Sequence, residues 1–410
     1  MTARRKRSSA PAAPTGPLVS GFRAAGVACG IKKSGLDLAL ILSDLPASVA
    51  GVFTRSTVVG APVELCRERV RNGRGRAIVV NSGISNVAMG ARGRRDAAAM
   101  AASAARAAGV PESEVLVAST GVIGEPLPMA KVRAGIEKAA GTLRAGGIAS
   151  AARAIMTTDT FPKVASRRIR LGGKLVTLAG IAKGSGMIEP NMATMLSFLM
   201  TDAAIAPPLL RRMLRAAADE SYNRLTIDGE GSTSDTVLLL ANGSSRAPLL
   251  RTERSPGAQR FVEALGELTV DLTQALARDG EGATKLVTVR VSGARSHADA
   301  ERAARRIANS LLVKTAIFGG DPNWGRILQT VGAGRVALDL AKTEVKLCGV
   351  AVFRRGSSAG PAARRRAGER LASRPEVEID VALGRGRGAA TLWTCDLTYD
   401  YVRINAEYTT

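Results

Sequence analysis

The distribution of apolar positions along the chain predicts short buried strands alternating with amphipathic helices. Apolar runs of about four to eight residues, bounded by turn-forming residues, are typical of buried strands. In the first half of the chain such runs occupy 38–43, 50–54, 77–81, 115–119 and 195–201. Helices are predicted at 94–109, which is rich in alanine and stops at Gly109-Val110-Pro111, and at 129–140.

The rest of the pattern predicts a hairpin and a further set of strands and helices. Residues 167–182 form two runs around Gly172-Gly173, which is typical of a hairpin. Helices are predicted at 207–223, 256–278 and 297–316, and strands at 236–241, 286–291, 344–353, 377–381 and 390–397. Residues 354–371, rich in glycine, arginine and alanine, are predicted to be a linker. Strands outnumber helices in a mixed order, which indicates an α/β or α+β fold.

Length and composition indicate a globular protein of two or three compact units. The chain has 410 residues, of which 46% are hydrophobic and 23% are charged. No apolar run approaches the roughly 18–20 residues that cross a bilayer, so no membrane partner is expected. Residues 1–17 are basic and rich in serine, proline and alanine, and we expect a disordered tail. The alternative is an organelle transit peptide, because such peptides are also rich in arginine and serine.

The formal net charge of +23 raises the question of a nucleic-acid partner. The arginines are scattered, however, and no basic motif carries interleaved aromatic residues. We therefore expect an arginine-rich solvated surface and no nucleic-acid partner. The alternative is a nucleic-acid-binding protein. It predicts a single chain that is not cleaved, and an affinity for nucleic acid that falls steeply as the salt concentration rises.

The cysteines at positions 29, 66, 348 and 395 indicate the compartment. None forms a CxxC pair, so a zinc or thioredoxin-like site has no support. Free thiols in a chain of this size are typical of a reducing compartment. We expect a cytoplasmic protein, or a protein of an organelle matrix if the basic tail is a transit peptide.

The inventory of reactive residues narrows the possible chemistry. The single histidine, His297, lies where a loop enters a predicted helix, so a histidine-based catalytic triad is not favoured. No P-loop is present, and no metal or cofactor is expected. One nucleophilic route needs no histidine: an N-terminal threonine whose own α-amine takes the hydroxyl proton. Pattern alone does not select which threonine this is.

Seven segments, taken in order, resemble the ornithine acetyltransferases of arginine biosynthesis. The most specific is KGSGMIEPNMATMLSF at 183–198, and the resemblance extends from about Gly21 onward. The other segments are STGVIGEPLPM (119–129), MTTDTFPK (156–163), TIDGEGSTSDT (226–236), RDGEGATK (278–285), VKTAIFGGDPNWGRI (313–327) and DLTYDYVRINAEYTT (396–410).

The resemblance implies a self-cleaving protein. Cleavage between Ala193 and Thr194 would give an α chain and a β chain, which assemble as two α and two β chains. The implied fold is α+β, a layered α/β/β/α sandwich like that of self-cleaving N-terminal-nucleophile enzymes. Residues 18–193 and 194–285 would form the core, and 286–410 a smaller C-terminal α/β domain.

The resemblance also implies a ping-pong reaction on amino-acid substrates. Thr194 would take the acetyl group from N2-acetyl-L-ornithine and pass it to L-glutamate. Thr120 and Gly121 match the family's oxyanion hole. The substrate-binding positions that match are Thr157, Lys183, Thr194, Glu281, Asn405 and Thr410. Acetyl-coenzyme A is a possible second donor, because some family members use it.

The sequence departs from the family pattern at a few positions and leaves one alternative reaction open. Ile84 and Met89 replace a small polar residue and a cysteine, and Ser234 stands where asparagine is common. These departures bear on substrate preference and leave the predicted catalytic residues untouched. The alternative is a self-processing amidase or aminopeptidase of the same fold, in which water replaces glutamate as the acyl acceptor.

Overall fold

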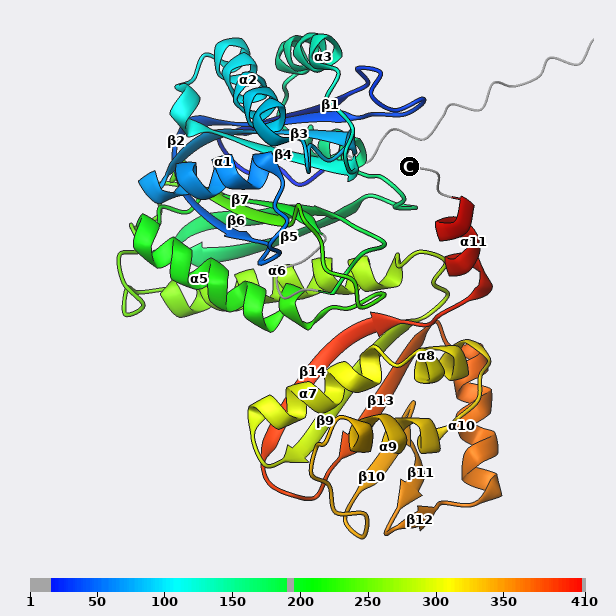
Figure 1. Cartoon of the computed structure of the whole chain (residues 1–410). Helices are drawn as coiled ribbons and strands as arrows, with labels where there is room; N and C mark the ends of the chain where they lie inside the picture. Colours follow the sequence, from blue (N-terminus) through cyan, green and yellow to red (C-terminus); the bar gives the residue numbers. More distant parts are fainter. Residues whose placement is uncertain (1–15, 190–194, 408–410) are drawn as a thin grey trace, which may run out of the picture.

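The protein has two parts, each built around its own β-sheet. A computed structural model describes residues 16–189 and 195–407 (Figure 1). Within these residues an eight-stranded sheet forms the first part, and a six-stranded sheet forms the second part below it. Residues 1–15, the predicted cleavage site at Ala193 and Thr194, and Thr410 lie outside the described residues. The predicted α+β class is confirmed.

The large sheet places two parallel strands side by side near its centre. Its order is β4-β3-β2-β8-β7-β6-β5, and β1 pairs with β2. Neighbouring β7 and β8 run parallel, with Leu196 opposite Thr236, so both strands begin at the same edge. The strands are β1 Phe22–Val27, β2 Leu38–Phe53, β3 Arg74–Ile84, β4 Val115–Val122, β5 Lys163–Leu171, β6 Lys174–Lys183, β7 Leu196–Thr201 and β8 Thr236–Ala241.

The long strand β2 joins the two layers of the sandwich. Its first part pairs with β3 and its last part with β8, and the register shifts between Leu42 and Ala47. The prediction of two separate strands at 38–43 and 50–54 was wrong here, because one strand continues through both. The polar and proline interruption at Asp44 and Pro46 lies at the bend, where these residues are exposed.

Helices cover both outer faces of the first part, which gives the expected α/β/β/α layering (Figure 1). On β7, Phe198 packs in the apolar cluster of β3 and β4, and Leu199 packs in the cluster of α5 and α6. Burial on both faces explains the continuous apolar runs of β7 and β8. The helices are α1 Ala61–Arg69, α2 Gly90–Ala108, α3 Met129–Gly141, α4 Ile148–Ala154, α5 Pro207–Glu220 and α6 Ala258–Arg278. Short 3₁₀ helices lie at Val70–Asn72, Glu112–Glu114 and Tyr222–Arg224.

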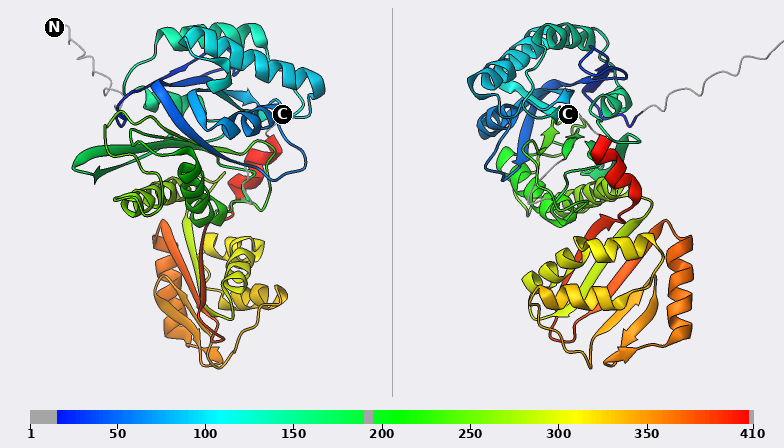
Figure 2. Two further views of the ribbon diagram at one scale, coloured as in Figure 1. Left: turned by 90° about the vertical axis from the view of Figure 1, so that its left-hand side faces the viewer. Right: turned by 45° about the vertical axis from the view of Figure 1, so that its right-hand side comes forward.

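The second part is a sheet of order β12-β11-β10-β13-β9-β14, with helices on both faces. Figure 2 shows α7, α8 and α9 on one side of this sheet and α10 on the other. Its strands are β9 Leu286–Ala294, β10 Glu344–Leu347, β11 Val350–Arg354, β12 Ser357–Ser358, β13 Glu376–Ala382 and β14 Gly388–Cys395. Its helices are α7 His297–Ala308, α8 Leu311–Phe318, α9 Trp324–Ala333 and α10 Pro361–Ser373.

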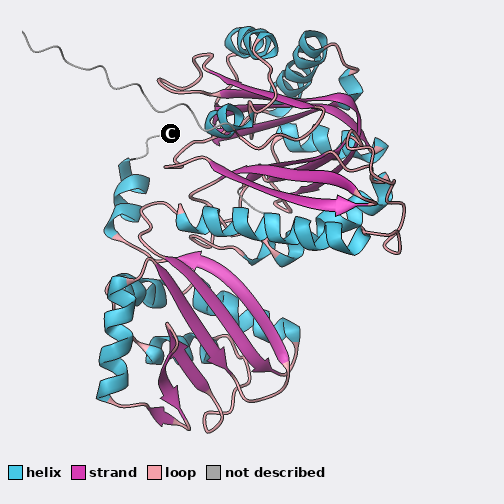
Figure 3. Ribbon diagram, turned by 180° about the vertical axis from the view of Figure 1, so that it is seen from behind, coloured by secondary structure: helices cyan, strands magenta, loops and turns pink. Residues whose placement is uncertain are grey.

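The two parts share apolar contacts, and the last helix returns to the first part. Leu286 of β9 and Trp393 of β14 belong to the apolar cluster of α5 and α6. Seen from behind, the second sheet lies beneath α6, and α11 Tyr399–Glu407 lies beside the first part (Figure 3). The chain end is thereby brought near the first part.

The predicted linker at 354–371 was wrong, because most of it forms α10. Pro361 stands in the first turn, where its missing N–H costs nothing. Ala363, Ala367 and Leu371 are buried at a four-residue spacing, so they form the apolar stripe of a helix. The many arginines hid this stripe in the sequence, and they occupy its solvated face.

Two other predicted elements are divided in the structure. The predicted helix 297–316 is two helices, because Ser310 ends the first and caps α8 by accepting from Val313 N. The predicted strand 344–353 is a hairpin that turns at Cys348 and Gly349, both with positive φ. The elements β1, α1, α4, α9 and α11 were not predicted.

Candidate active site

Lys183 connects two of the predicted site threonines. Its Nζ atom donates to Thr120 Oγ1 at 2.9 Å and to Thr157 Oγ1 at 3.1 Å. Thr120 comes from β4 and Lys183 ends β6, where it is only 4% exposed. Because each hydroxyl oxygen accepts from the ammonium group, its own hydrogen remains available to donate to a ligand. Three predicted site residues therefore form one hydrogen-bonded cluster, while their roles stay predictions.

Asp159 fixes the backbone around this cluster. Its carboxylate accepts from Gly184 N at 2.7 Å and from Thr157 N at 3.0 Å. It also contacts Lys163 Nζ at 2.6 Å, and Lys163 in turn contacts Asp279 at 2.5 Å. Although burial opposes it, the ammonium groups of Lys183 and Lys163 hold the pKa of Asp159 below its usual range. A buried network with these contacts holds its members in one arrangement.

The electrostatic state of Lys183 suits an anionic ligand. Burial lowers the pKa of its ammonium group, because loss of water disfavours the charged form. The Asp159 carboxylate opposes this decrease, whereas the nearby Lys163 adds to it. A carboxylate or a developing oxyanion at this position would replace part of the lost hydration.

The backbone next to Thr120 requires glycine. Gly121 has a φ of +127°, and a Cβ atom there would lie 2.2 Å from the carbonyl carbon of Gly83. Only glycine tolerates both the conformation and this close approach. The Thr120-Gly121 pair therefore ends β4 in a shape that an ordinary strand residue would prevent.

The loop formed by residues 226–236 holds the chain on both sides of the predicted cleavage site. On the N-terminal side, the Asp228 carboxylate accepts from Met187 N at 2.6 Å. On the C-terminal side, Asp235 Oδ1 accepts from Met195 N at 2.7 Å. The same loop therefore anchors the described residues on either side of the predicted cleavage site.

A small cavity lies directly beside Met195, the residue that follows the predicted nucleophile. Thr120, Lys183 and Asp235, the residue directly before β8, all line it. Its volume of about 10 Å³ holds about one water molecule. The other lining residues are Met195, Leu196, Ser232 and Ser234.

The predicted residues Glu281 and Asn405 form a second pair. Asn405 Nδ2 donates to Glu281 Oε2 at 2.9 Å, which links α11 to the end of α6. Glu281 N donates to the carbonyl of Ser185 at 2.7 Å. A Cβ on Gly186 would lie 2.4 Å from Glu281 Oε2, so glycine is needed there. Burial lowers the pKa of Lys183, and the Glu281 carboxylate is among the groups that oppose this decrease, which relates the pair to the main cluster.

The carboxylates that support the site were not predicted from the sequence. Asp159, Asp228 and Asp235 lie in segments that carry the family resemblance, but no role was predicted for them. One signal was available for Asp235, an acidic residue directly before β8, in which residues 237–241 are all apolar. The three-dimensional pairing of Lys163 with Asp279, which are 116 positions apart, carried no local signal.

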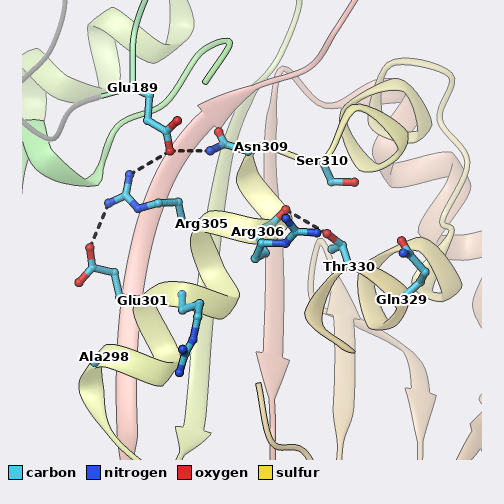
Figure 4. Close-up of a pocket in the computed structure, with 10 residues that line it drawn as sticks. Glu189, Ala298, Glu301, Arg305, Arg306, Asn309, Ser310, Gln329 and Thr330 are labelled. Carbon is cyan, nitrogen blue, oxygen red and sulfur yellow. Dashed lines mark hydrogen bonds and ion pairs between the residues drawn. The ribbon is translucent and has the colours of Figure 1, made fainter. Parts of the chain in front are cut away.

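A much larger pocket lies at the junction of the two parts, away from this cluster. Its volume is about 640 Å³, and Figure 4 shows its lining from α7, α9 and the segment before the cleavage site. Glu189 accepts from Asn309 Nδ2 at 2.6 Å and lies 3.6 Å from Arg305. Arg305 also pairs with Glu301 at 3.0 Å, so much of the pocket's charge is already neutralised. None of the predicted site residues lines it.

The described residues lack two other kinds of feature, a membrane-spanning helix and a metal-binding cluster. No helix in the described part of the chain is long and apolar enough to cross a membrane. Within residues 16–189 and 195–407, no group of three or more His, Cys, Asp and Glu side chains could hold a metal ion. Cys29, Cys66, Cys348 and Cys395 are free thiols.

Comparison with known proteins gives consistent similarities over nearly the whole chain. The family model "ArgJ family" matches residues 23–410. The chain is 49% identical over 393 residues to the "Arginine biosynthesis bifunctional protein ArgJ" of Geobacter sulfurreducens, covering 96% of this chain and 100% of that protein. It is 46% identical over 406 residues to the protein of that name from Thermosynechococcus vestitus, covering 95% and 96%. A solved ArgJ structure from Bacillus halodurans has a TM-score of 0.50 at 40% identity and covers 52% of this chain and 100% of its own.

Proposed function

Because this chain belongs to the ArgJ family and is an acetyltransferase of arginine biosynthesis, we propose that it moves the acetyl group of N2-acetyl-L-ornithine to L-glutamate. The products are ornithine and N-acetylglutamate. One observation carries the proposal: a buried lysine holds the Thr120 hydroxyl in the cavity beside Met195. This arrangement places hydrogen-bond donors next to the residue that follows Thr194.

The proposal begins with self-cleavage between Ala193 and Thr194. The Thr194 hydroxyl attacks the Ala193 carbonyl carbon, the C–N bond breaks, and the hydroxyl proton ends on the released nitrogen. Water then hydrolyses the ester, which frees the α chain as a carboxylate and restores the Thr194 hydroxyl. Two observations support this step. Asp228 and Asp235 anchor the described residues on the two sides of the cleavage site. The solved Bacillus halodurans chain is matched over its full length but covers only 52% of this chain, as one of two fragments would.

In turnover the free α-amine of Thr194 takes the hydroxyl proton, and the oxygen attacks the acetyl carbonyl. The oxyanion receives hydrogen bonds from the Thr120 hydroxyl and the Gly121 N–H. The protonated amine then gives its proton to the departing nitrogen of ornithine, which leaves an acetyl ester on Thr194. Glutamate attacks this ester through its amino group and restores the enzyme. No resident cofactor is needed, because every proton stays with Thr194 or a substrate.

The predicted binding residues divide between the two ends of the substrate. Lys183 and Thr157 suit the α-carboxylate that acetylornithine and glutamate share, because desolvated Lys183 gains from an anion. Glu281, held by Asn405, suits the side-chain ammonium of ornithine. Thr410, which also matches a binding position of the family, is assigned to the same end of the substrate.

Intact mass and N-terminal sequencing test the core of the proposal. The purified protein should give two fragments, one beginning TMLSF, while Thr194→Ala should remain a single chain without transfer. Acetyl transfer to glutamate should exceed release of free acetate. If acetate release dominated, the protein would be a hydrolase of the same fold, and an uncut wild-type chain without transfer would overturn the proposal.

Three further expectations complete the proposed function. Acetyl-coenzyme A is a second donor, as the family resemblance implies, and release of free coenzyme A with glutamate measures it. Two α and two β chains form the assembly, which a solution mass determines. The enzyme works in the cytoplasm, or in an organelle matrix if the basic tail is a transit peptide, and its free thiols support a reducing compartment.

A further inference from the structure

Asp235 has a buried carboxyl group of which only one oxygen is used. Its side chain is fully buried, with an exposure of 1%. Oδ1 accepts from Met195 N at 2.7 Å, whereas Oδ2 has no hydrogen-bond partner among the described residues. A buried polar atom without a partner costs about 1–3 kcal/mol, so such atoms are rare without a reason.

The position of Asp235 follows from the register of two parallel strands. Asp235 directly precedes β8 and Met195 directly precedes β7, and Thr236 N returns a hydrogen bond to the Met195 carbonyl at 3.1 Å. The carboxyl is therefore fixed against the first residue after Thr194 by the sheet itself. Asp235 also lines the cavity that Thr120 and Lys183 line.

Residue 194 is bonded directly to Met195, whose N–H donates to this carboxyl group. Its backbone nitrogen is joined to Met195 N through two backbone carbons, which separates the two nitrogens by at most about 3.7 Å. Before cleavage this nitrogen is a neutral amide. After cleavage it becomes a basic α-amine, which is a natural partner for a carboxylate.

We propose that Asp235 is a positioning residue for transfer, which orients the new α-amine of Thr194 through Oδ2 while Oδ1 holds the Met195 amide. The proposal rests on the proposed function, because it needs Thr194 to be the first residue of the β chain. The arrangement has three members: a hydroxyl nucleophile, an α-amine that takes its proton, and a carboxylate that orients the amine and stabilises its protonated form. The same division of roles operates in hydrolases with a serine, a histidine and an aspartate.

The surroundings of Asp235 suit a carboxyl group that binds a cationic partner. Burial raises its pKa well above the usual range, and the Met195 N–H, the Lys183 ammonium and the nearby Ser232 hydroxyl oppose this increase, although the Ser232 hydroxyl does not reach hydrogen-bonding geometry with Oδ2. Lys183 comes from β6, and the neighbours from the other elements are neutral: Thr120 of β4, Ser232 and Ser234. A protonated α-amine beside Oδ2 would lower the pKa of the carboxyl and raise its own.

The decisive variant is Asp235→Asn, which keeps an oxygen for Met195 N but cannot carry a negative charge. We expect the variant to be cut, because the uncut amide needs no carboxylate partner. Its kcat for transfer should fall about 10²-fold while KM for acetylornithine changes by less than about twofold. The acidic limb of its pH profile should move to lower pH, because an amine without a neighbouring negative charge loses its proton more easily. Asp235→Glu, which restores the charge, should return the limb toward the wild-type position.

A matched control is available at the other end of β7. Asp202 is also a buried carboxyl, 4% exposed, and it accepts from Thr177 N at 2.8 Å. Burial raises its pKa too, although the Thr177 N–H opposes this. Asp202→Asn should be cut and should retain transfer within about twofold.

Each outcome of these measurements decides the proposal. An unchanged kcat, an unmoved acidic limb, or an effect on KM alone in Asp235→Asn would overturn it. If neither Asp235→Asn nor Asp235→Glu were cut, Asp235 would serve cleavage instead, and the proposal would also fail. Failure of the proposed function is seen separately, because it would appear in the wild-type protein as an uncut chain or absent transfer.

Discussion

The small cavity beside Met195 and the junction pocket differ in nearly every property. The first has a volume of about 10 Å³ and the second about 640 Å³, which lies within the range of ordinary ligand sites. The small cavity is lined by a buried lysine of lowered pKa and by a buried carboxyl of raised pKa. In the junction pocket, Arg305 is partly exposed and already paired with Glu189 and Glu301. The buried groups with shifted pKa values therefore lie in the region with almost no free space.

Cavity volume and electrostatic environment therefore select different regions of the molecule. The pKa of a charged group that is excluded from water depends strongly on its neighbours, because a nearby anion changes the energy of the group far more than it would in solvent. The partly exposed ion pairs of the junction pocket are screened and contribute little. The closed state of the small cavity also means that substrate binding must enlarge it.

Lys163 should show the largest effect on stability. Lys163→Met leaves the carboxylates of Asp159 and Asp279 buried without their shared cation, and breaking such a buried network costs about 3–5 kcal/mol. The loss is measured as a decrease in the free energy of unfolding in urea. Arg167→Met is the matched control on the same strand, because Arg167 also bridges two acids, Glu267 and Asp271, in solvent. Its cost should be at most about 1 kcal/mol, and equal costs would remove the contrast between buried and exposed pairs.

Among the residues that line the small cavity, Lys183 should show the largest effect on catalysis. Lys183→Ala removes the donor to Thr120 and Thr157, and loss of a buried charged partner costs about 2–5 kcal/mol, or about 10³-fold in rate. Both half-reactions should decrease, because both substrates carry the α-carboxylate that Lys183 is proposed to bind. Rates of ornithine release and of acetyl transfer to glutamate measure them separately. Unchanged turnover would exclude this role.

Thr120 should affect kcat more than substrate affinity. Thr120→Val keeps the shape of the side chain but removes the hydroxyl, and loss of one oxyanion donor reduces kcat by about 10²-fold or somewhat more. KM for acetylornithine should stay near the wild-type value, because the interaction forms only as negative charge develops. A change confined to KM would place Thr120 in substrate binding instead. Self-cleavage of the variant, followed by intact mass, shows whether the same donor serves both reactions.

Features set by local sequence patterns or by family motifs could be predicted, whereas features set by contacts between distant residues could not. The apolar runs predicted β7 and β8, because these strands are buried on both faces. Family resemblance selected Thr120, Thr157 and Lys183, which the structure brings within hydrogen-bonding distance. The buried carboxylates were missed because their partners are distant in the chain, as with Lys163 and Asp279. Helix α10 was missed because its exposed arginines outnumber its three buried apolar residues.

Asn405 should have a modest effect that is specific to ornithine. Asn405→Ala removes the donor to Glu281 at the exposed edge of the site, and an exposed hydrogen bond of this kind is worth about 1 kcal/mol. KM for acetylornithine should rise by about fivefold, whereas KM for glutamate, which lacks the side-chain ammonium, should change less. Equal changes for both substrates would argue against an ammonium partner at Glu281.

Arg306 in the junction pocket should have almost no effect on transfer. Its side chain is exposed, and the hydrogen bond that Thr330 makes in this pocket goes to the Arg306 carbonyl, which a substitution keeps (Figure 4). Arg306→Gln should therefore leave cleavage, kcat and KM within about twofold of the wild type, since an exposed charge at this distance from the reacting atoms is screened by solvent. The same steady-state assays used for Lys183→Ala measure it directly. A tenfold loss of transfer would mean that the large pocket takes part in the reaction, and the division between an open pocket and a closed catalytic cluster would have to be abandoned.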